Sequence, residues 1–144
     1  MNSDFRTGLA AVGPLLLLAG LGLGACGEKP QQVPTHTLYG TVTSSTVVAN
    51  QRLAWIKLVG EDGDIDEPPL YSSSCLMQGP SCDYSMLFIA EGNYTAFAFI
   101  DMDGNAEQSE LLPEAGDLVS GARPLFLLEK TRLDFLDQGW RTMP

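Results

Sequence analysis

Hydrophobic and polar side chains alternate over residues 35–44. Leu38 and Val42 fall on one side of an extended chain there, whereas Thr41 and Thr43 fall on the other. A period of two in a segment rich in Thr and Val is typical of a half-buried β-strand. The pattern therefore predicts the first strand of a folded domain at this point.

Later segments predict further strands, most of them apolar on both faces. The clearest cover residues 51–59, for which a short helix is the alternative, 84–90 and 94–101. In 94–101 aromatic and apolar side chains occupy both faces, which is typical of a central strand between two layers. The turn signal Glu91-Gly92-Asn93 precedes this strand. Residues 123–135 supply one or two closing strands, and the alternative for Leu127–Leu136 is a short C-terminal amphipathic helix.

Strands separated by Gly-, Pro- and Asp-rich connections predict an all-β sandwich. Three features resemble transthyretin-like and carboxypeptidase-regulatory-like domains: an early Tyr39–Val42 strand, a G-x-Y turn at Gly92–Tyr94 and a strand ending in the acidic loop Asp101–Asn105. The resemblance covers Leu38–Asp117. It implies a small Greek-key β-sandwich of about seven strands, used as an accessory, adhesive or structural module.

The N-terminal residues follow a different pattern. A short polar segment containing Arg6 precedes the apolar run Leu9–Leu23. The run is shorter than the roughly 20 residues that span a bilayer, and it suits a signal peptide. It leads into Leu23-Gly24-Ala25-Cys26, which resembles the bacterial lipobox. The resemblance implies cleavage before Cys26 and acylation of Cys26; the alternative is an ordinary signal peptide.

This interpretation divides the chain into three parts: a lipoprotein signal peptide (1–25), a lipidated tether (26–34) and a β-sandwich domain (35–144). We expect a membrane-anchored protein of the bacterial cell envelope that faces the periplasm or the exterior, because several acyl chains hold a protein stably on a bilayer. Gly27, rather than Asp, follows the cysteine. By resemblance to lipoproteins of enteric bacteria, this favours the outer membrane.

The cysteine content agrees with export. If Cys26 is lipidated, Cys75 and Cys82 remain as a pair seven residues apart, with Gly79-Pro80 between them. A turn at Gly79-Pro80 favours their approach, so the spacing predicts an intrachain disulfide in an oxidising compartment. A catalytic dithiol normally has the spacing C-x-x-C, which this pair lacks.

Composition narrows the classes of partner. The chain is 44% hydrophobic and 18% charged, which argues against intrinsic disorder. Its 18 acidic residues outnumber its 8 basic ones and give a formal net charge of −10. Such a charge repels phosphate backbones and excludes nucleic-acid binding, whereas divalent cations and cationic partners remain compatible with it.

One acidic loop carries the pattern of a cation site. Asp101, Asp103 and Asn105 have the D-x-D-x-N spacing of many calcium loops, and Glu107 and Glu110 offer further oxygen ligands. Calcium takes roughly six to eight oxygens, which alternate residues of a tight loop can supply. The loop lacks the Gly and the bidentate Glu of an EF-hand. The alternative is a solvated acidic turn.

A second acidic stretch, residues 61–67, also alternates, with Asp at positions 62, 64 and 66. It predicts a solvated loop. The alternative is that it supplies ligands to the first loop or holds a weak second site.

Catalytic motifs do not emerge from the sequence. His36 is its one histidine, and no G-x-S-x-G motif is present. We therefore expect a non-enzymatic envelope protein with a structural, adhesive or partner-binding role, its partner being another envelope protein or a glycan. The alternatives are a small metal- or carboxylate-dependent hydrolase and a pilot-type lipoprotein for a secretion or efflux component.

Overall fold

The computed structural model describes residues 34–108 and 110–144. The predicted signal peptide, the lipobox and the tether up to residue 33 lie outside the described residues. The described chain forms nine strands and two short 3-10 helices: β1 (Thr35–Thr43), η1 (Val47–Ala49), β2 (Leu53–Val59), β3 (Tyr71–Leu76), β4 (Ser81–Ala90), β5 (Gly92–Asp101), β6 (Leu118–Ser120), β7 (Arg123–Leu127), β8 (Thr131–Arg132), η2 (Asp137–Gly139) and β9 (Trp140–Thr142).

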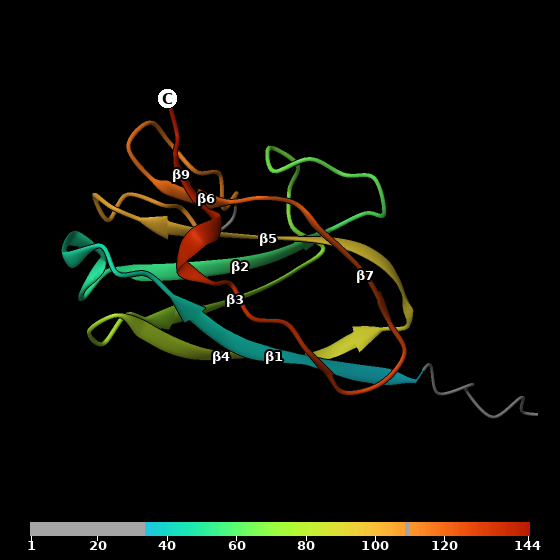
Figure 1. Ribbon diagram of the computed structural model, residues 1–144. Coiled ribbons are helices and arrows are strands. Elements are labelled where there is room, and N and C mark those ends of the chain that lie inside the picture. The colour runs from blue at the N-terminus through green and yellow to red at the C-terminus, as the bar shows by residue number, and fades with distance from the viewer. Residues whose placement is uncertain (1–33, 109) are drawn as a thin grey trace, which may run out of the picture. The chain divides into compact units, whose positions relative to one another are not determined.

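The strands form two sheets (Figure 1). The small sheet has the order β4-β1-β8, with β1 antiparallel to β4 and parallel to β8. The large sheet has the order β3-β2-β5-β6-β9, and β7 pairs with the N-terminal half of β5. The all-β class and the two-sheet sandwich are thus confirmed, with nine strands in the described residues instead of about seven.

The main core lies between the sheets and follows the alternation of their strands. Leu38 and Val42 of β1 face inward, as the sequence pattern predicts, and pack in one cluster with Ile56 of β2 and Ala98 of β5. Gly40 lies between the two β1 residues, where the backbone carbonyl of the residue-133 segment passes so close that a Cβ atom would collide with it. A glycine is therefore required at this point for the C-terminal segment to run beside β1.

The edges of the two sheets are joined at one corner. Cys75 of β3 and Cys82 of β4 lie at disulfide distance, with an S–S separation of 2.09 Å and a Cα–Cα separation of 5.8 Å. The Ser73 hydroxyl donates to the carbonyl of Ser85 at 2.9 Å, also between β3 and β4. The predicted cysteine pair therefore joins two strands that belong to different sheets.

The helix alternative for Leu127–Leu136 is wrong. This segment completes β7, forms β8 and then runs on beside β1, where the amides of Leu133 and Phe135 donate to the carbonyls of Tyr39 and Thr41. These backbone bonds to β1 replace the bonds that a helix would have made within the segment. Among the described residues, no helix has the length and apolarity needed to cross a membrane.

Candidate functional site

The acidic loop begins where β5 ends, at the buried residue Asp101. Its carboxylate accepts the amide hydrogens of Gly104 at 2.7 Å, Asn105 at 3.2 Å and Ala106 at 3.1 Å. Gly104 has φ = 82°, a left-handed conformation that favours glycine. The Asp-x-x-Gly-Asn sequence thus folds into a tight turn wrapped around one carboxylate.

A second buried carboxylate, that of Asp117, lies beside this turn. It accepts the amide hydrogens of Met102 at 2.8 Å and Glu114 at 2.9 Å. One carboxylate oxygen from each of Asp101, Asp103 and Asp117 lies within 4.8 Å of the others. The structure therefore brings together two of the predicted ligands and a third that the sequence interpretation missed.

The remaining predicted ligands are placed differently. The side-chain amide of Asn105 donates to Asp103 at 2.8 Å and to Glu114 at 3.0 Å, so its NH₂ group rather than its oxygen faces the carboxylates. Glu107 and Glu110 are exposed and line a neighbouring hollow instead of joining the three-carboxylate group. The arrangement resembles the predicted site only at its first two positions.

Electrostatics favour the charged form of Asp101. Burial alone would raise the pKa of this carboxyl, but the amide donors of Ala106, Gly104 and Asn105 outweigh burial and hold the pKa below its ordinary value. Asp101 is therefore an ionised group inside the protein whose charge is neutralised in part by backbone dipoles.

The second acidic stretch lies over the outer face of the large sheet and is held by a buried lysine. The ammonium group of Lys57 donates to the carbonyls of Ile65, Glu67 (2.9 Å) and Leu111 (3.1 Å). Burial lowers the pKa of Lys57, while the nearby carboxylates of the 61–67 stretch oppose that effect. Lys57 thus links the two acidic loops, although no carboxylate of 61–67 belongs to the described three-carboxylate group.

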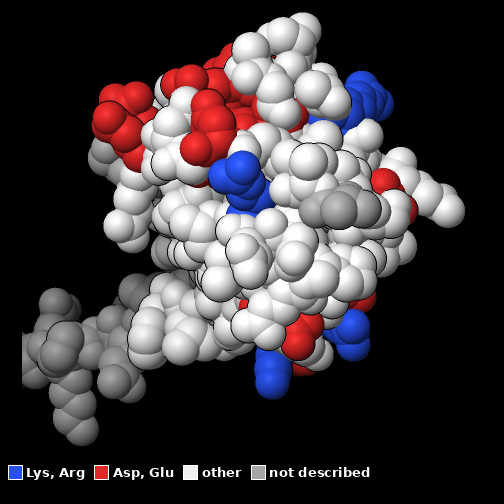
Figure 2. All heavy atoms as spheres, turned by 90° about the vertical axis from the view of Figure 1, so that its left-hand side faces the viewer, with Lys and Arg blue, Asp and Glu red and all other residues white. Residues whose placement is uncertain are grey.

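Acidic side chains gather on one part of the molecular surface. Figure 2 shows acidic side chains gathered along the upper edge of the face in view, whereas basic side chains stand singly. A divalent cation or a cationic partner would be attracted to such an edge.

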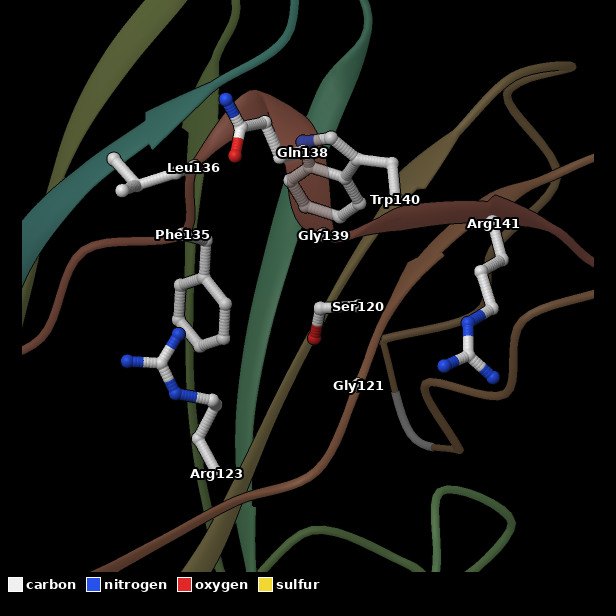
Figure 3. Close-up of a pocket in the computed structure, with 9 residues that line it drawn as sticks. All are labelled: Ser120, Gly121, Arg123, Phe135, Leu136, Gln138, Gly139, Trp140 and Arg141. Atoms are coloured by element: carbon white, nitrogen blue, oxygen red, sulfur yellow. The ribbon is translucent and has the colours of Figure 1, made fainter.

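A further hollow, of about 470 Å³, has the opposite character. We call it the Arg123 pocket; its lining residues are Ser120, Gly121, Arg123, Phe135, Leu136, Gln138, Gly139, Trp140 and Arg141. Two arginines and no acidic residue line it, although acidic residues outnumber basic ones in the chain by more than two to one. In Figure 3 the guanidinium of Arg123 lies beside the Phe135 ring, while Arg141 points away from both.

The polar groups of the Arg123 pocket are positioned by the fold. The indole nitrogen of Trp140 donates to the carbonyl of Thr43 at 2.7 Å, which fixes the ring at the pocket wall. Ser120 accepts the Ala98 amide at 2.8 Å and keeps its own hydroxyl hydrogen for another acceptor. The carboxylate of Asp137, next to the pocket, accepts hydrogen bonds from the backbone amide and the hydroxyl of Ser45. The pocket suits an anionic ligand with a face that can lie against an aromatic ring.

No protein-family model, curated protein or solved structure matches the chain. The transthyretin-like resemblance therefore remains a prediction.

Proposed function

We propose that the protein is a lipid-anchored cell-envelope protein whose β-sandwich binds a partner rather than catalysing a reaction. The observation that carries the location is the pairing of Cys75 in β3 with Cys82 in β4, because disulfides form and persist in oxidising compartments. The lipobox-like segment ending at Cys26 supplies the attachment, and the outer membrane is the favoured site. The sandwich would then face the periplasm or the exterior.

The partner-binding role is supported by the Arg123 pocket. Its volume lies within the roughly 300–1,000 Å³ of small-ligand sites. A guanidinium recognises carboxylates through paired hydrogen bonds, and an indole face packs against a sugar ring. A carboxylated glycan matches this chemistry.

The acidic turn has a structural part in this proposal. Calcium would bind Asp101, Asp103 and Asp117, whose crowded negative charge it would neutralise. Because Asp101 and Asp117 already accept backbone amides, the ion would rigidify a turn that the chain has largely formed. Raising calcium to millimolar concentration should increase the melting temperature of the full-length protein, and Asp103→Ala should remove the increase. An unchanged melting curve would contradict calcium binding and would leave the interpretation of a solvated acidic turn.

The anchor is tested by Cys26→Ser. Cells fed a clickable palmitate analogue should label the parent protein and not the variant, and the variant should lack the acyl chains that hold the parent in membranes. Acyl labelling that persists in Cys26→Ser would overturn the anchor. Two alkylatable thiols at Cys75 and Cys82 in exported protein would overturn the oxidised pair.

Binding is tested by calorimetry of the detergent-solubilised full-length protein with trigalacturonate, using the neutral trigalactoside for comparison. We expect the acidic sugar to bind at least tenfold more tightly, and Arg123→Gln to remove that preference. Arg132→Gln is the matched control, since Arg132 is paired with Asp134 at 3.0 Å outside the pocket. The proposal would be contradicted if the parent bound both sugars equally, or if Arg123→Gln kept the same preference for the acidic sugar as Arg132→Gln.

A further inference from the structure

The β1–β4 ladder contains a bulge near the start of the domain. His36 pairs with Ile89 and Leu38 with Met86, so the single residue between the β1 partners faces two residues of β4, Leu87 and Phe88. A bulge of this kind redirects side chains and interrupts the alternation of a strand. Here it places two consecutive apolar residues at the surface.

Phe88 adopts an unfavourable backbone conformation. Its φ is 61°, in the left-handed region that bulky aromatic residues rarely occupy. The side chain is 75% exposed and that of Leu87 is 54% exposed, whereas Met86 and Ile89 on either side are buried. Burial within the described domain therefore does not offset the backbone strain at Phe88, whereas a contact outside the domain would offset it.

The bulge lies where the tether joins the sandwich. Thr35, the first residue of β1, pairs with Ala90, two residues beyond Phe88 and so within about 10 Å along the strand. Two further exposed apolar residues, Phe126 and Leu128, lie at or just after the end of β7, which pairs with the start of β5. Figure 1 shows the start of β1, the end of β4 and the β7 strand at the same end of the sandwich.

The length of the tether limits the distance from a bilayer. From Cys26 to Thr35 the chain advances nine residues, which span at most about 30 Å when fully extended. An acylated Cys26 would therefore keep the start of β1 within about 30 Å of the lipid headgroups. Confinement by the tether also raises the local concentration of membrane surface, so a small apolar contact suffices to hold the domain down.

We propose that Leu87 and Phe88 form a wedge that inserts into the interfacial layer of the membrane carrying the lipid anchor. The inference rests on the proposed lipidation of Cys26. Glu61, the first residue of the acidic stretch 61–67, lines a hollow together with Phe126 at the same end. We therefore expect the wedge to dock on a zwitterionic membrane surface and to be repelled by an anionic one. Docking fixes the orientation of the sandwich. The opposite end, which carries η1 and the acidic loop that begins at Asp101, then points away from the bilayer.

The test uses full-length lipidated protein reconstituted in phosphatidylcholine vesicles. Phe88→Cys carries an environment-sensitive fluorophore, since acylation occupies Cys26 and the disulfide occupies Cys75 and Cys82. Val48→Cys is the matched control, because Val48 is 62% exposed in η1, beyond the other end of β1. Brominated lipid should quench the probe at position 88 at least threefold more than the probe at position 48. Equal quenching would overturn the wedge.

A second variant separates docking from folding. Phe88→Gly suits the positive φ and should leave the melting temperature equal or higher, while a probe on Phe126→Cys should lose most of its quenching by lipid. A large fall in melting temperature would assign Phe88 a packing role and overturn the wedge. Adding anionic lipid should weaken docking, and stronger docking there would contradict the proposed surface.

Co-flotation with vesicles distinguishes the two proposals. Parent and Phe88→Gly should both float, because the acyl chains hold them. A parent protein that does not float refutes the anchor, whereas flotation without preferential quenching at position 88 refutes the wedge alone.

Discussion

The two outer faces of the sandwich differ in how they meet solvent. On the large sheet, two loops cover the strands and bury Trp55, Lys57 and Phe99 beneath them. On the small sheet, the outward side chains are half-buried in most of β1 and exposed in most of β4, and most of them are Thr, Ser or Asp. The comparison shows that the loops, rather than the strands, decide which face becomes interior.

The open face has pairwise contacts between side chains at the surface. Thr41 donates to Asp83 across the ladder at 2.7 Å, and the ammonium of Lys130 lies 4.8 Å from the centre of the Tyr39 ring. The covered face instead depends on a buried ammonium group that donates hydrogen bonds to the carbonyls of two different loops. Substitutions on the covered face should therefore have larger effects than substitutions on the open one.

The largest effect is expected for Lys57→Met, which keeps the apolar stem but leaves the carbonyls of Ile65, Glu67 and Leu111 without this donor. We expect the free energy of unfolding to fall by about 3–5 kcal/mol in urea titrations. Hydrogen exchange should accelerate in residues 61–67 and 102–111. Lys130→Met is the matched control on the open face and should change stability by less than about 1 kcal/mol. Equal losses would contradict the difference between the faces.

The second largest effect on stability is expected at the Cys75–Cys82 disulfide, which joins the two sheets. Replacing Cys75 and Cys82 together by Ser should reduce the free energy of unfolding by about 2–3 kcal/mol, since the small closed loop restricts the unfolded chain only modestly. The measurement is urea unfolding of parent and variant without reductant. A loss as large as that of Lys57→Met would mean that the corner, not the loop cover, dominates stability.

Acid should act on the covered side through Asp101. Because its pKa is lowered in the fold, its contribution is fully present above the unfolded pKa of about 3.9 and disappears as the pH falls through the folded value. Asp101→Asn should reduce the free energy of unfolding at pH 7 by about 1–2 kcal/mol and flatten its decline towards pH 2.5. Glu107→Gln, on the exposed part of the same loop, is the control. An unchanged slope in Asp101→Asn would refute this assignment.

The smallest effect is expected on the open face. Thr41→Val removes the hydroxyl bond to Asp83 but keeps a β-branched side chain, so stability should change by no more than about 0.5–1 kcal/mol. Thermal unfolding at neutral pH would measure it. A loss above about 2 kcal/mol would show that the open face holds a network as important as the covered one.

Periodicity predicted the strands that build the core but not the elements that build the sites. The alternation in β1 and the two-sided apolar segments β2 and β5 are explained by one open and one covered face. The short strands β6, β8 and β9 have two or three residues each and carry no period. Their positions are set by backbone pairing with distant strands, which no local pattern encodes.

The same reason limits the prediction of the sites. Asp101 and Asp103 were found from their spacing in one loop, whereas Asp117 reaches them because Leu118 pairs with Ile100. The Arg123 pocket likewise collects β6, the start of β7, η2 and β9. The sequence offers one indication of an anion-binding pocket. Basic residues are scarce in this chain, so two arginines in one pocket lining are unusual.

The position of β1 has a consequence for the order in which the molecule is completed. In an exported chain, as we propose, it would be the first strand of the domain to leave the translocation channel, whereas its other neighbour, at Thr131 and Arg132, would follow much later. Closing so long a loop is slow, so the small sheet would stay incomplete until that segment arrives. Under the proposed export, this pairing order would keep the chain unfolded during translocation and would complete the small sheet only after residues 131 and 132 have crossed.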